Sequence, residues 1–386
     1  MLSSTLDRLR CPSRRRKGAI CRGSLQLFPE QRTKIEAPVP IFEVEAGNLV
    51  CLNCSEKFPI LGGVAILVED VRLYLTSHVK GIAKMIKDSD IPREYRRDFL
   101  AAKAEIQSEH IEEDLEAERV NSLYLMNHYL HVSDHQKKSK APWWIPRSEP
   151  GSPLMDSLVK EYWDQGPFSK IKDWIEKISA SSSRYDVIDL GCGVGGLGLL
   201  LKPYIRSYLG IDSSFASVTL ARHLVLGSPY PGKIRIPEDL LDGPVSREVP
   251  FLAKLQPKVQ VEGVDYVVGD LENPPVPNGK WDIALALNAI DMLDDPSVLP
   301  RLKHRLLRKK GIAIQCCPYI WYEGVARDLK AQLPAHIKSS AKATEWLYEQ
   351  EGFKIDESID HVPWLFFKHV RQMEIYSVHL FRASQG

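Results

Sequence analysis

The sequence has no long apolar run. None of its segments approaches the roughly 20 consecutive apolar residues of a membrane-spanning helix. Its arginine-containing start lacks the apolar segment that a secretory signal carries. Cysteines are few, seven in all, and their odd number favours a reducing compartment. We therefore expect a cytoplasmic protein that has no membrane partner.

An excess of charge of either sign is also missing. The net charge is +1, so no overall field attracts nucleic acid or an anionic membrane. With 44% hydrophobic and 26% charged residues, the composition is typical of a soluble globular protein, and 386 residues suffice for two domains. Pattern and turn signals predict a small β-module over 1–70, a helical segment over 71–136, a linker over 137–153 and an α/β domain over 154–386.

A glycine-rich stretch organises the α/β domain. The apolar run 187–190 predicts a buried strand, and 197–201 can begin a helix. The turn between them satisfies G-x-G-x-x-G through Gly191, Gly193 and Gly196, a pattern typical of dinucleotide binding. It also satisfies D-x-G-x-G-x-G through Asp189, Gly191, Gly193 and Gly195. Glycines allow positive φ and a close approach of the backbone to a ligand, so a nucleotide-like cofactor is predicted here.

Polar residues follow three further predicted strands. Asp212 ends the strand that begins near Ser207, and a carboxylate there can accept both ribose hydroxyls of an adenosine cofactor. Asp270 and Leu271 end the strand 264–269. Asn288 and Asp291 follow the strand that begins at 281, at the sheet edge where open α/β folds bind ligands.

In this order, the four signals resemble the class I S-adenosylmethionine (SAM) methyltransferases over about 155–386. The resemblance implies an α/β, Rossmann-like sheet of seven strands with an antiparallel last strand. It implies that Asp270 meets the adenine amino group and that the next backbone N–H meets a ring nitrogen. The implied cofactor-binding residues are Asp189, Gly191, Cys192, Gly193, Gly195, Asp212, Ser213, Asp270, Leu271 and Asn288.

A closer resemblance concerns the substrate side. The segments 210–215, 288–296 and 318–321, with the long insertion 226–263, resemble the methyltransferase domain of ovothiol-synthesis enzymes, which methylate an imidazole nitrogen of a mercaptohistidine. That family usually has N-L-I-D-R-L, from which Ala289 and Met292 depart. Asn288, Asp291 and Tyr319 are the predicted catalytic or substrate-positioning residues, and Tyr319 can form an aromatic wall with Trp321.

The N-terminal module carries four of the cysteines. Its segments 11–12, 21–25, 49–54 and 58–63 resemble a small zinc-ribbon family that includes activator subunits of tRNA and protein methyltransferases. Zinc prefers four soft ligands in a tetrahedron, and the resemblance implies Cys11, Cys21, Cys51 and Cys54. The nine residues between Cys11 and Cys21 depart from a short knuckle. Either the module binds structural zinc or it relies on its apolar core.

Three histidines and the methyl acceptor each admit more than one interpretation. One side of a predicted helix carries His128, His131 and His135. These histidines can form a metal site, a polar face near the substrate cleft, or part of the ordinary surface. For the whole chain, we expect a methyltransferase that acts on a small-molecule nucleophile. Three other functions remain open. The first is an RNA or protein methyltransferase that uses the N-terminal module and the basic run 14–17 for recognition. The others are a non-catalytic SAM-binding regulator and an NAD oxidoreductase.

Overall fold

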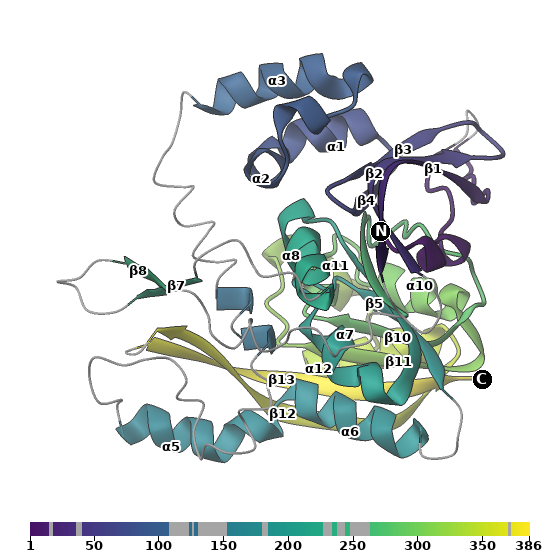
Figure 1. Ribbon diagram of the computed structural model, residues 1–386. Helices are drawn as coiled ribbons and strands as arrows, with labels where there is room; N and C mark the ends of the chain where they lie inside the picture. The colour runs from purple at the N-terminus through teal and green to yellow at the C-terminus, as the bar shows by residue number, and fades with distance from the viewer. Residues whose placement is uncertain are drawn as a thin grey trace.

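A large twisted sheet forms the centre of the protein in a computed structural model (Figure 1). The structure describes residues 1–14, 18–35, 41–107, 123–125, 127–129, 153–179, 184–226, 234–237, 244–247, 263–369 and 372–386. The strand order is β1-β2-β3-β4-β9-β6-β5-β10-β11-β13-β12. These eleven strands are β1 Leu25–Ile35, β2 Ile41–Cys51, β3 Lys57–Leu61, β4 Val64–Leu67, β5 Tyr185–Leu190, β6 Ile205–Asp212, β9 Val264–Gly269, β10 Trp281–Leu287, β11 Leu307–Cys317, β12 Phe353–His369 and β13 Gln372–Gln385.

The part of the sheet from β9 to β12 contains the α/β domain. Its strands β9, β6, β5, β10 and β11 run parallel, and β13 is antiparallel to both β11 and β12. Strand β9 is buried along its whole length, and β5 is buried from Val187 to Leu190, as their continuous apolar runs predict. Because β13 pairs antiparallel with β11, the predicted antiparallel direction of the last strand is confirmed.

The sheet is larger than the predicted seven strands because the N-terminal module extends it. Ile66 and Leu67 of β4 pair in parallel with Val268 and Gly269 of β9, so the two predicted units share one sheet. Their junction is charged and buried: Arg222 of α8 (Phe215–Val225) donates to Glu43 of β2 at 2.5 and 2.6 Å and forms an ion pair with Asp265 of β9. Sequence spacing carries no sign of this junction, because its residues come from distant segments.

Helices cover the sheet and its N-terminal extension. Helices α1, α2 and α3 lie together at the top of Figure 1, and α5 and α6 lie along the β12–β13 hairpin at its bottom. Their bounds are α1 Val71–Ser77, α2 Val79–Met85, α3 Arg93–Gln107, α5 Pro153–Tyr162, α6 Pro167–Ser179, α7 Gly196–Leu201, α10 Val298–Leu306, α11 Glu323–Gln332 and α12 Ser340–Gln350. A separate hairpin has β7 at Ile234–Pro237 and β8 at Pro244–Arg247.

Several local predictions can be compared with these bounds. The pattern of apolar residues over 154–178 predicts two amphipathic helices separated at Gly166, and α5 and α6 confirm them. The pair Lys310 and Gly311 predicts a turn before a strand, whereas Lys310 has φ +65° inside the continuous strand β11. Residues 123–125 and 127–129 are helical, as predicted for that segment. The basic residues 15–17, nearly all of the linker 137–153, most of the insertion 226–263, His131 and His135 lie outside the described residues.

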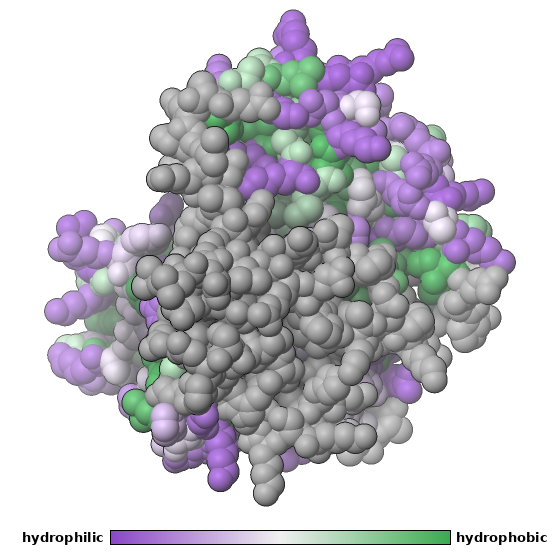
Figure 2. Space-filling view, turned by 60° about the vertical axis from the view of Figure 1, so that its left-hand side comes forward, coloured by the Kyte–Doolittle hydropathy of each residue, from purple (hydrophilic) through white to green (hydrophobic). Residues whose placement is uncertain are grey.

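The surface in Figure 2 shows hydrophilic side chains projecting at the top of the molecule, over the N-terminal part. Hydrophobic residues lie between them in this view. In the described part of the chain, no helix has the length and apolar character needed to cross a membrane.

Candidate active site

The turn after β5 has the backbone geometry that its glycines predict. Gly191, Gly193 and Gly195 have φ values of +81°, +53° and +78°, which residues with a Cβ rarely adopt. The backbone N–H of Gly191 donates to the carbonyl oxygen of Ile211 at 2.9 Å, which ties the turn to β6. A Cβ on Gly195 would lie 2.5 Å from the Tyr266 ring, so glycine is also required there by close packing.

Two acidic residues from neighbouring strand ends flank this turn. Asp212 Oδ2 accepts from the Gly193 N–H at 2.8 Å, and Asp212 Oδ1 accepts from the Ser214 N–H at 2.9 Å. Each of these oxygens keeps a further lone pair for a ligand hydroxyl. Burial raises the pKa of Asp212, and its two backbone hydrogen bonds oppose that rise.

Asp189 is more deeply buried than Asp212. The Tyr208 hydroxyl donates to its Oδ2, whereas its buried Oδ1 has no hydrogen-bond partner among the described residues. Burial raises the pKa of Asp189 to about 6, against the lowering effects of Tyr208 and Lys303. A buried carboxylate oxygen without a partner is costly, and a cationic ligand group would satisfy it.

A cavity of about 620 Å³ opens beside the turn and the two acids. It brings together residues predicted as site residues from three strand ends, namely Asp189, Gly191, Cys192, Gly193, Asp212, Asn288 and Asp291. Asn288 has φ +52°, and buried Asp291 accepts from the Ile320 N–H at 2.8 Å, which fixes the loop after β11. The cavity therefore lies at the carboxyl ends of the parallel strands, where the sequence predicts it.

Five predicted residues are not among the described residues that line the cavity. Gly195 packs against Tyr266, and Asp270 is exposed at the end of β9. Leu271 lies near Gly191, and the Ser213 carbonyl oxygen accepts from the Tyr74 hydroxyl at 2.6 Å. The fifth is Tyr319, whose hydroxyl bonds to Nδ1 of His379 at 2.7 Å.

Tyr319 instead supports a residue of the cavity wall. Its ring stacks on Trp321 with centroids 5.5 Å apart, and Trp321 lines the cavity. Ser358 and Glu345 contact the other nitrogen of His379, at 2.9 and 3.2 Å. The aromatic wall predicted from Tyr319 and Trp321 is therefore present, but Trp321 alone of the two faces the cavity.

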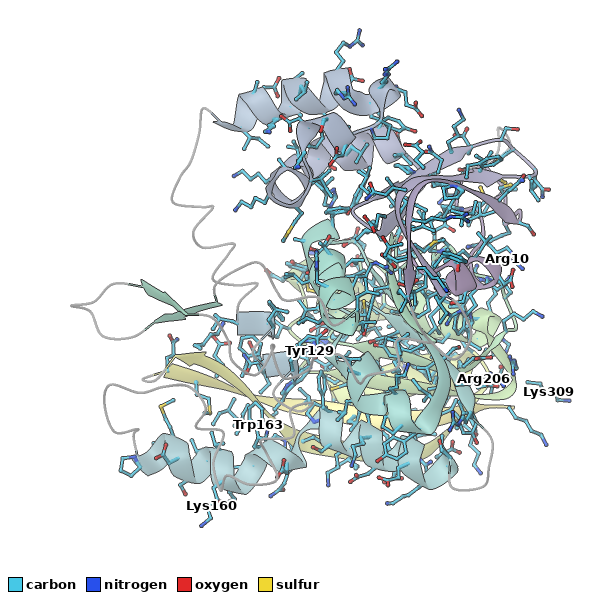
Figure 3. All side chains as sticks on the ribbon, in the orientation of Figure 1. Arg10, Tyr129, Lys160, Trp163, Arg206 and Lys309 are labelled. Atoms are coloured by element: carbon cyan, nitrogen blue, oxygen red, sulfur yellow. The ribbon has the colours of Figure 1, made fainter. Side chains whose placement is uncertain are left out.

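The helical residues 127–129 cover the glycine turn, a contact that sequence reasoning did not locate. The buried Tyr129 hydroxyl donates to the Val194 carbonyl oxygen at 2.6 Å, and Tyr129 points into the middle of the molecule (Figure 3). A Cβ on Gly196 would lie 2.6 Å from the carbonyl oxygen of His128. His128 lines the cavity, and its buried Nδ1 has no partner among the described residues. Of the three histidines on the predicted helix side, His128 is thus placed beside the cofactor turn.

The four N-terminal cysteines form one cluster. The Sγ atoms of Cys11, Cys21, Cys51 and Cys54 all lie within 4.8 Å of one another. The pairs Cys11–Cys54 and Cys21–Cys51 are 3.6 and 3.7 Å apart, close to the roughly 3.8 Å between sulfurs bound tetrahedrally at 2.3 Å to zinc. The spacing of nine residues is accommodated because the Cys11 N–H donates to the Gly23 carbonyl oxygen and the Cys21 N–H to that of Ser13.

The residues present fit SAM. This molecule has an ammonium group for the unpartnered oxygen of Asp189 and ribose hydroxyls for Asp212, and the glycine turn leaves its backbone open to a ligand. The strand order and this site define a class I SAM-dependent methyltransferase fold.

One comparison with known proteins shows the family. A family described as "Methyltransferase domain" matches residues 162–358, which is more than half of the chain, so the chain belongs to that family. No curated protein matches the chain.

Solved structures also resemble part of the chain. Magnesium protoporphyrin IX methyltransferase from Synechocystis PCC 6803, with bound SAH, is 14% identical, with a TM-score of 0.37 over 62% of this chain and 90% of that chain. A putative methyltransferase from Bacillus halodurans is 14% identical, with a TM-score of 0.37 over 56% of this chain and 99% of that chain. A complex of a methyltransferase activator and a putative methyltransferase from Haloferax volcanii gives 16% identity and a TM-score of 0.33, over 56% of this chain and 90% of that chain.

Proposed function

We propose that the protein transfers a methyl group from SAM to a small-molecule nucleophile in the 620 Å³ cavity. One observation carries this proposal: Asp189 and Asp212 line the same cavity beside the glycine turn. The buried Oδ1 of Asp189 has no partner among the described residues. Asp189 would hold the ammonium group and Asp212 the ribose hydroxyls. The exposed Asp270, with Leu271 beside Gly191, would bind the adenine ring at the outer side of the turn.

The residues of the chain mainly bind and orient the reactants. SAM, when bound, supplies an electrophilic methyl group on a sulfonium. Orientation of reactants in a closed site contributes roughly 7–11 kcal/mol to catalysis. Asn288 and Asp291 lie at the end of β10 and would position the acceptor, with Trp321 as a wall. We assign Tyr319 a positioning role, because its hydroxyl is bonded to His379 and its ring stacks on Trp321.

The acceptor class in this proposal rests on resemblance. The likeness of 288–296 to mercaptohistidine N-methyltransferases makes imidazoles and thiols the first acceptors to assay. Neither a neutral imidazole nor a thiolate needs a base at the moment of attack.

Calorimetric titration with SAM tests the cofactor assignment. We expect Asp212→Asn to weaken SAM binding roughly tenfold to 100-fold, because a charge-assisted hydrogen bond contributes about 1.5–3 kcal/mol. The exposed Asp294 makes the matched control, since Asp294→Asn changes a nearby carboxylate outside the cavity. Equal affinity in both variants would reject the role of Asp212.

We also propose that the four-cysteine cluster holds a structural zinc ion. Its support is the pair of sulfur distances near 3.7 Å and the burial of three of the four thiols. Metal analysis of purified protein should give one zinc per chain, and Cys54→Ser should lose it. Asn53→Ser in the same loop should keep it. A metal-free wild-type protein that is fully folded would refute the zinc site.

A further inference from the structure

Part of the cavity has aromatic walls. They come from three parts of the fold: the helical residues 123–125 and 127–129, α6 and the β12–β13 hairpin. The rings pack on one another, with Phe168 and Trp364 centroids 5.8 Å apart and Tyr124 edge-on to Phe366 at 5.4 Å. Tyr376 and Trp321 complete the wall. Such surfaces favour a flat ligand that stacks on them.

The mouth of the cavity is also apolar. Met292, Ile320 and Tyr322 line it, and their exposed fractions are 63%, 65% and 60%. Large apolar side chains with that exposure, grouped around one cavity, are typical of a binding site for an apolar ligand. An acceptor with an apolar body would remove these side chains from water.

Positive charge is scarce in the same cavity. Among the described lining residues, Lys368 is the single lysine or arginine. Its Nζ lies 3.2 Å from Glu374 Oε1 and 4.9 Å from the centre of the Phe366 ring. The charge of Lys368 is therefore already compensated, and a phosphate or a nucleic-acid backbone would find no free cation among these lining residues.

One polar group on the aromatic side is unsatisfied. The His128 ring packs edge-on against Phe168 at 5.2 Å, and its buried Nδ1 lacks a partner in the described part of the chain. Burial lowers the pKa of His128 to about 4, so the imidazole is neutral at pH 7. The titratable side chains that also face this cavity are Asp189, Asp212, Asp291, Cys192, Tyr124, Tyr322, Tyr376 and Lys368. A neutral imidazole nitrogen can accept a hydrogen bond without repelling a sulfonium.

We propose that the methyl acceptor is a flat, uncharged aromatic compound with one hydroxyl or ring N–H, which donates its hydrogen bond to Nδ1 of His128. This proposal rests on the proposed function and specifies its substrate class. Transfer forms a C–O or C–N bond on the acceptor and breaks the methyl–sulfur bond, whose electron pair stays on sulfur. The methylated acceptor, which is a strong acid, then releases its hydroxyl or ring N–H proton to solvent, and Nδ1 of His128 acts as a hydrogen-bond acceptor that orients the group before transfer.

Binding of simple probes tests this substrate class. The full chain is saturated with SAH, and three ligands are titrated by calorimetry: 1-naphthol, naphthalene without the hydroxyl, and 1-naphthyl phosphate. We expect 1-naphthol to bind roughly threefold to tenfold tighter than naphthalene, the range of one neutral hydrogen bond. The phosphate should bind at least tenfold more weakly than 1-naphthol. Tighter binding of the phosphate, or no binding of 1-naphthol, overturns the proposal.

Two variants separate the roles of the residues. In His128→Phe the ratio of 1-naphthol affinity to naphthalene affinity should fall to about one, a ratio that a merely structural role would leave unchanged. Trp364→Leu should weaken both aromatic ligands at least fivefold, and Phe28→Leu on exposed β1 should change neither. A preference that persists in His128→Phe contradicts the assignment of that residue.

Methyl labelling distinguishes this proposal from the function on which it rests. Failure of SAH to bind would reject the proposed function itself. Bound SAH together with methyl label in a polar zwitterion such as a mercaptohistidine, or in RNA or protein, would leave the methyltransferase intact and overturn the aromatic acceptor.

Discussion

Replacing Asp189 by asparagine should stabilise the protein and weaken its cofactor binding at the same time. Burial raises the pKa of Asp189 from 3.8 to about 6. The folded protein thus binds this proton more tightly than the unfolded chain does, so the free energy of unfolding falls as pH rises from about 4 to about 6. The pKa rise of about 2.2, at about 1.36 kcal/mol for each pKa unit, corresponds to a loss of about 3 kcal/mol.

Asp189→Asn removes that loss, because an amide has no proton to give up in this range. We expect the variant to gain about 1–3 kcal/mol in urea unfolding at pH 8, and this gain should be about 2 kcal/mol smaller at pH 4.5, where most of the Asp189 carboxyl in the folded protein is still protonated. Its affinity for SAM should fall roughly tenfold to 100-fold, because the ammonium group loses an ionised partner. SAM affinity of the wild-type protein should rise between pH 5 and 7 as Asp189 ionises. A stability gain of equal size at both pH values would refute the assigned pKa, and unchanged SAM affinity would refute the assigned role.

Two further substitutions test the packing that positions the site. Gly195→Ala should lower the free energy of unfolding by about 2 kcal/mol or more in urea unfolding, because it combines φ +78° with a Cβ 2.5 Å from Tyr266; unaltered stability would show that the turn relaxes. Arg222→Met removes the cation that pairs with both buried carboxylates, Glu43 and Asp265, and leaves Glu43 only the N-terminal ammonium at 3.2 Å. It should cost about 3–5 kcal/mol in the same assay, with partial recovery in Arg222→Met/Glu43→Gln. If the double variant is no more stable than Arg222→Met, the Glu43 charge is not the source of the lost stability.

The part of the cavity beside the glycine turn could be predicted because its signals are local. The glycine turn, Asp212 and Asn288 each stand next to a strand with a continuous apolar run, and parallel topology brings such strand ends to one edge. The antiparallel last strand that the resemblance implies is present as β13, but β13 lies between β11 and β12, and β12 forms the edge of the sheet. Backbone strain at Asn288 was not predictable, since asparagine tolerates many conformations and its φ of +52° depends on the surrounding loop.

The aromatic part of the cavity could not be predicted because tertiary packing assembles it. His128 and Phe168 belong to helices whose sequence patterns indicate an amphipathic face and do not say what that face covers. Trp364 and Phe366 alternate along β12, and this alternation is the signal that could have placed them on one face of the long hairpin. The position of Tyr319 after β11 suggests a site residue, but its φ of +62° turns the side chain toward His379.

The joining of the N-terminal module to the same sheet also lay beyond sequence reasoning. Strand β4 and strand β9 are separated by about 200 residues, and neither carries a mark of its partner. The four thiols that the resemblance names lie together despite the long spacing between Cys11 and Cys21, and their role as zinc ligands stays a prediction.

Methyl transfer itself is the measurement that tests the central claim most directly. The purified protein is incubated with methyl-labelled SAM and a fractionated cell extract, with Asp212→Asn as the inactive control and Asp294→Asn as the active one. We predict label in the small-molecule fraction, dependent on Asp212 and extractable into an apolar solvent. The absence of label in every fraction, with SAM bound to the wild-type protein, would contradict a methyltransferase and identify a SAM-binding protein without transfer activity.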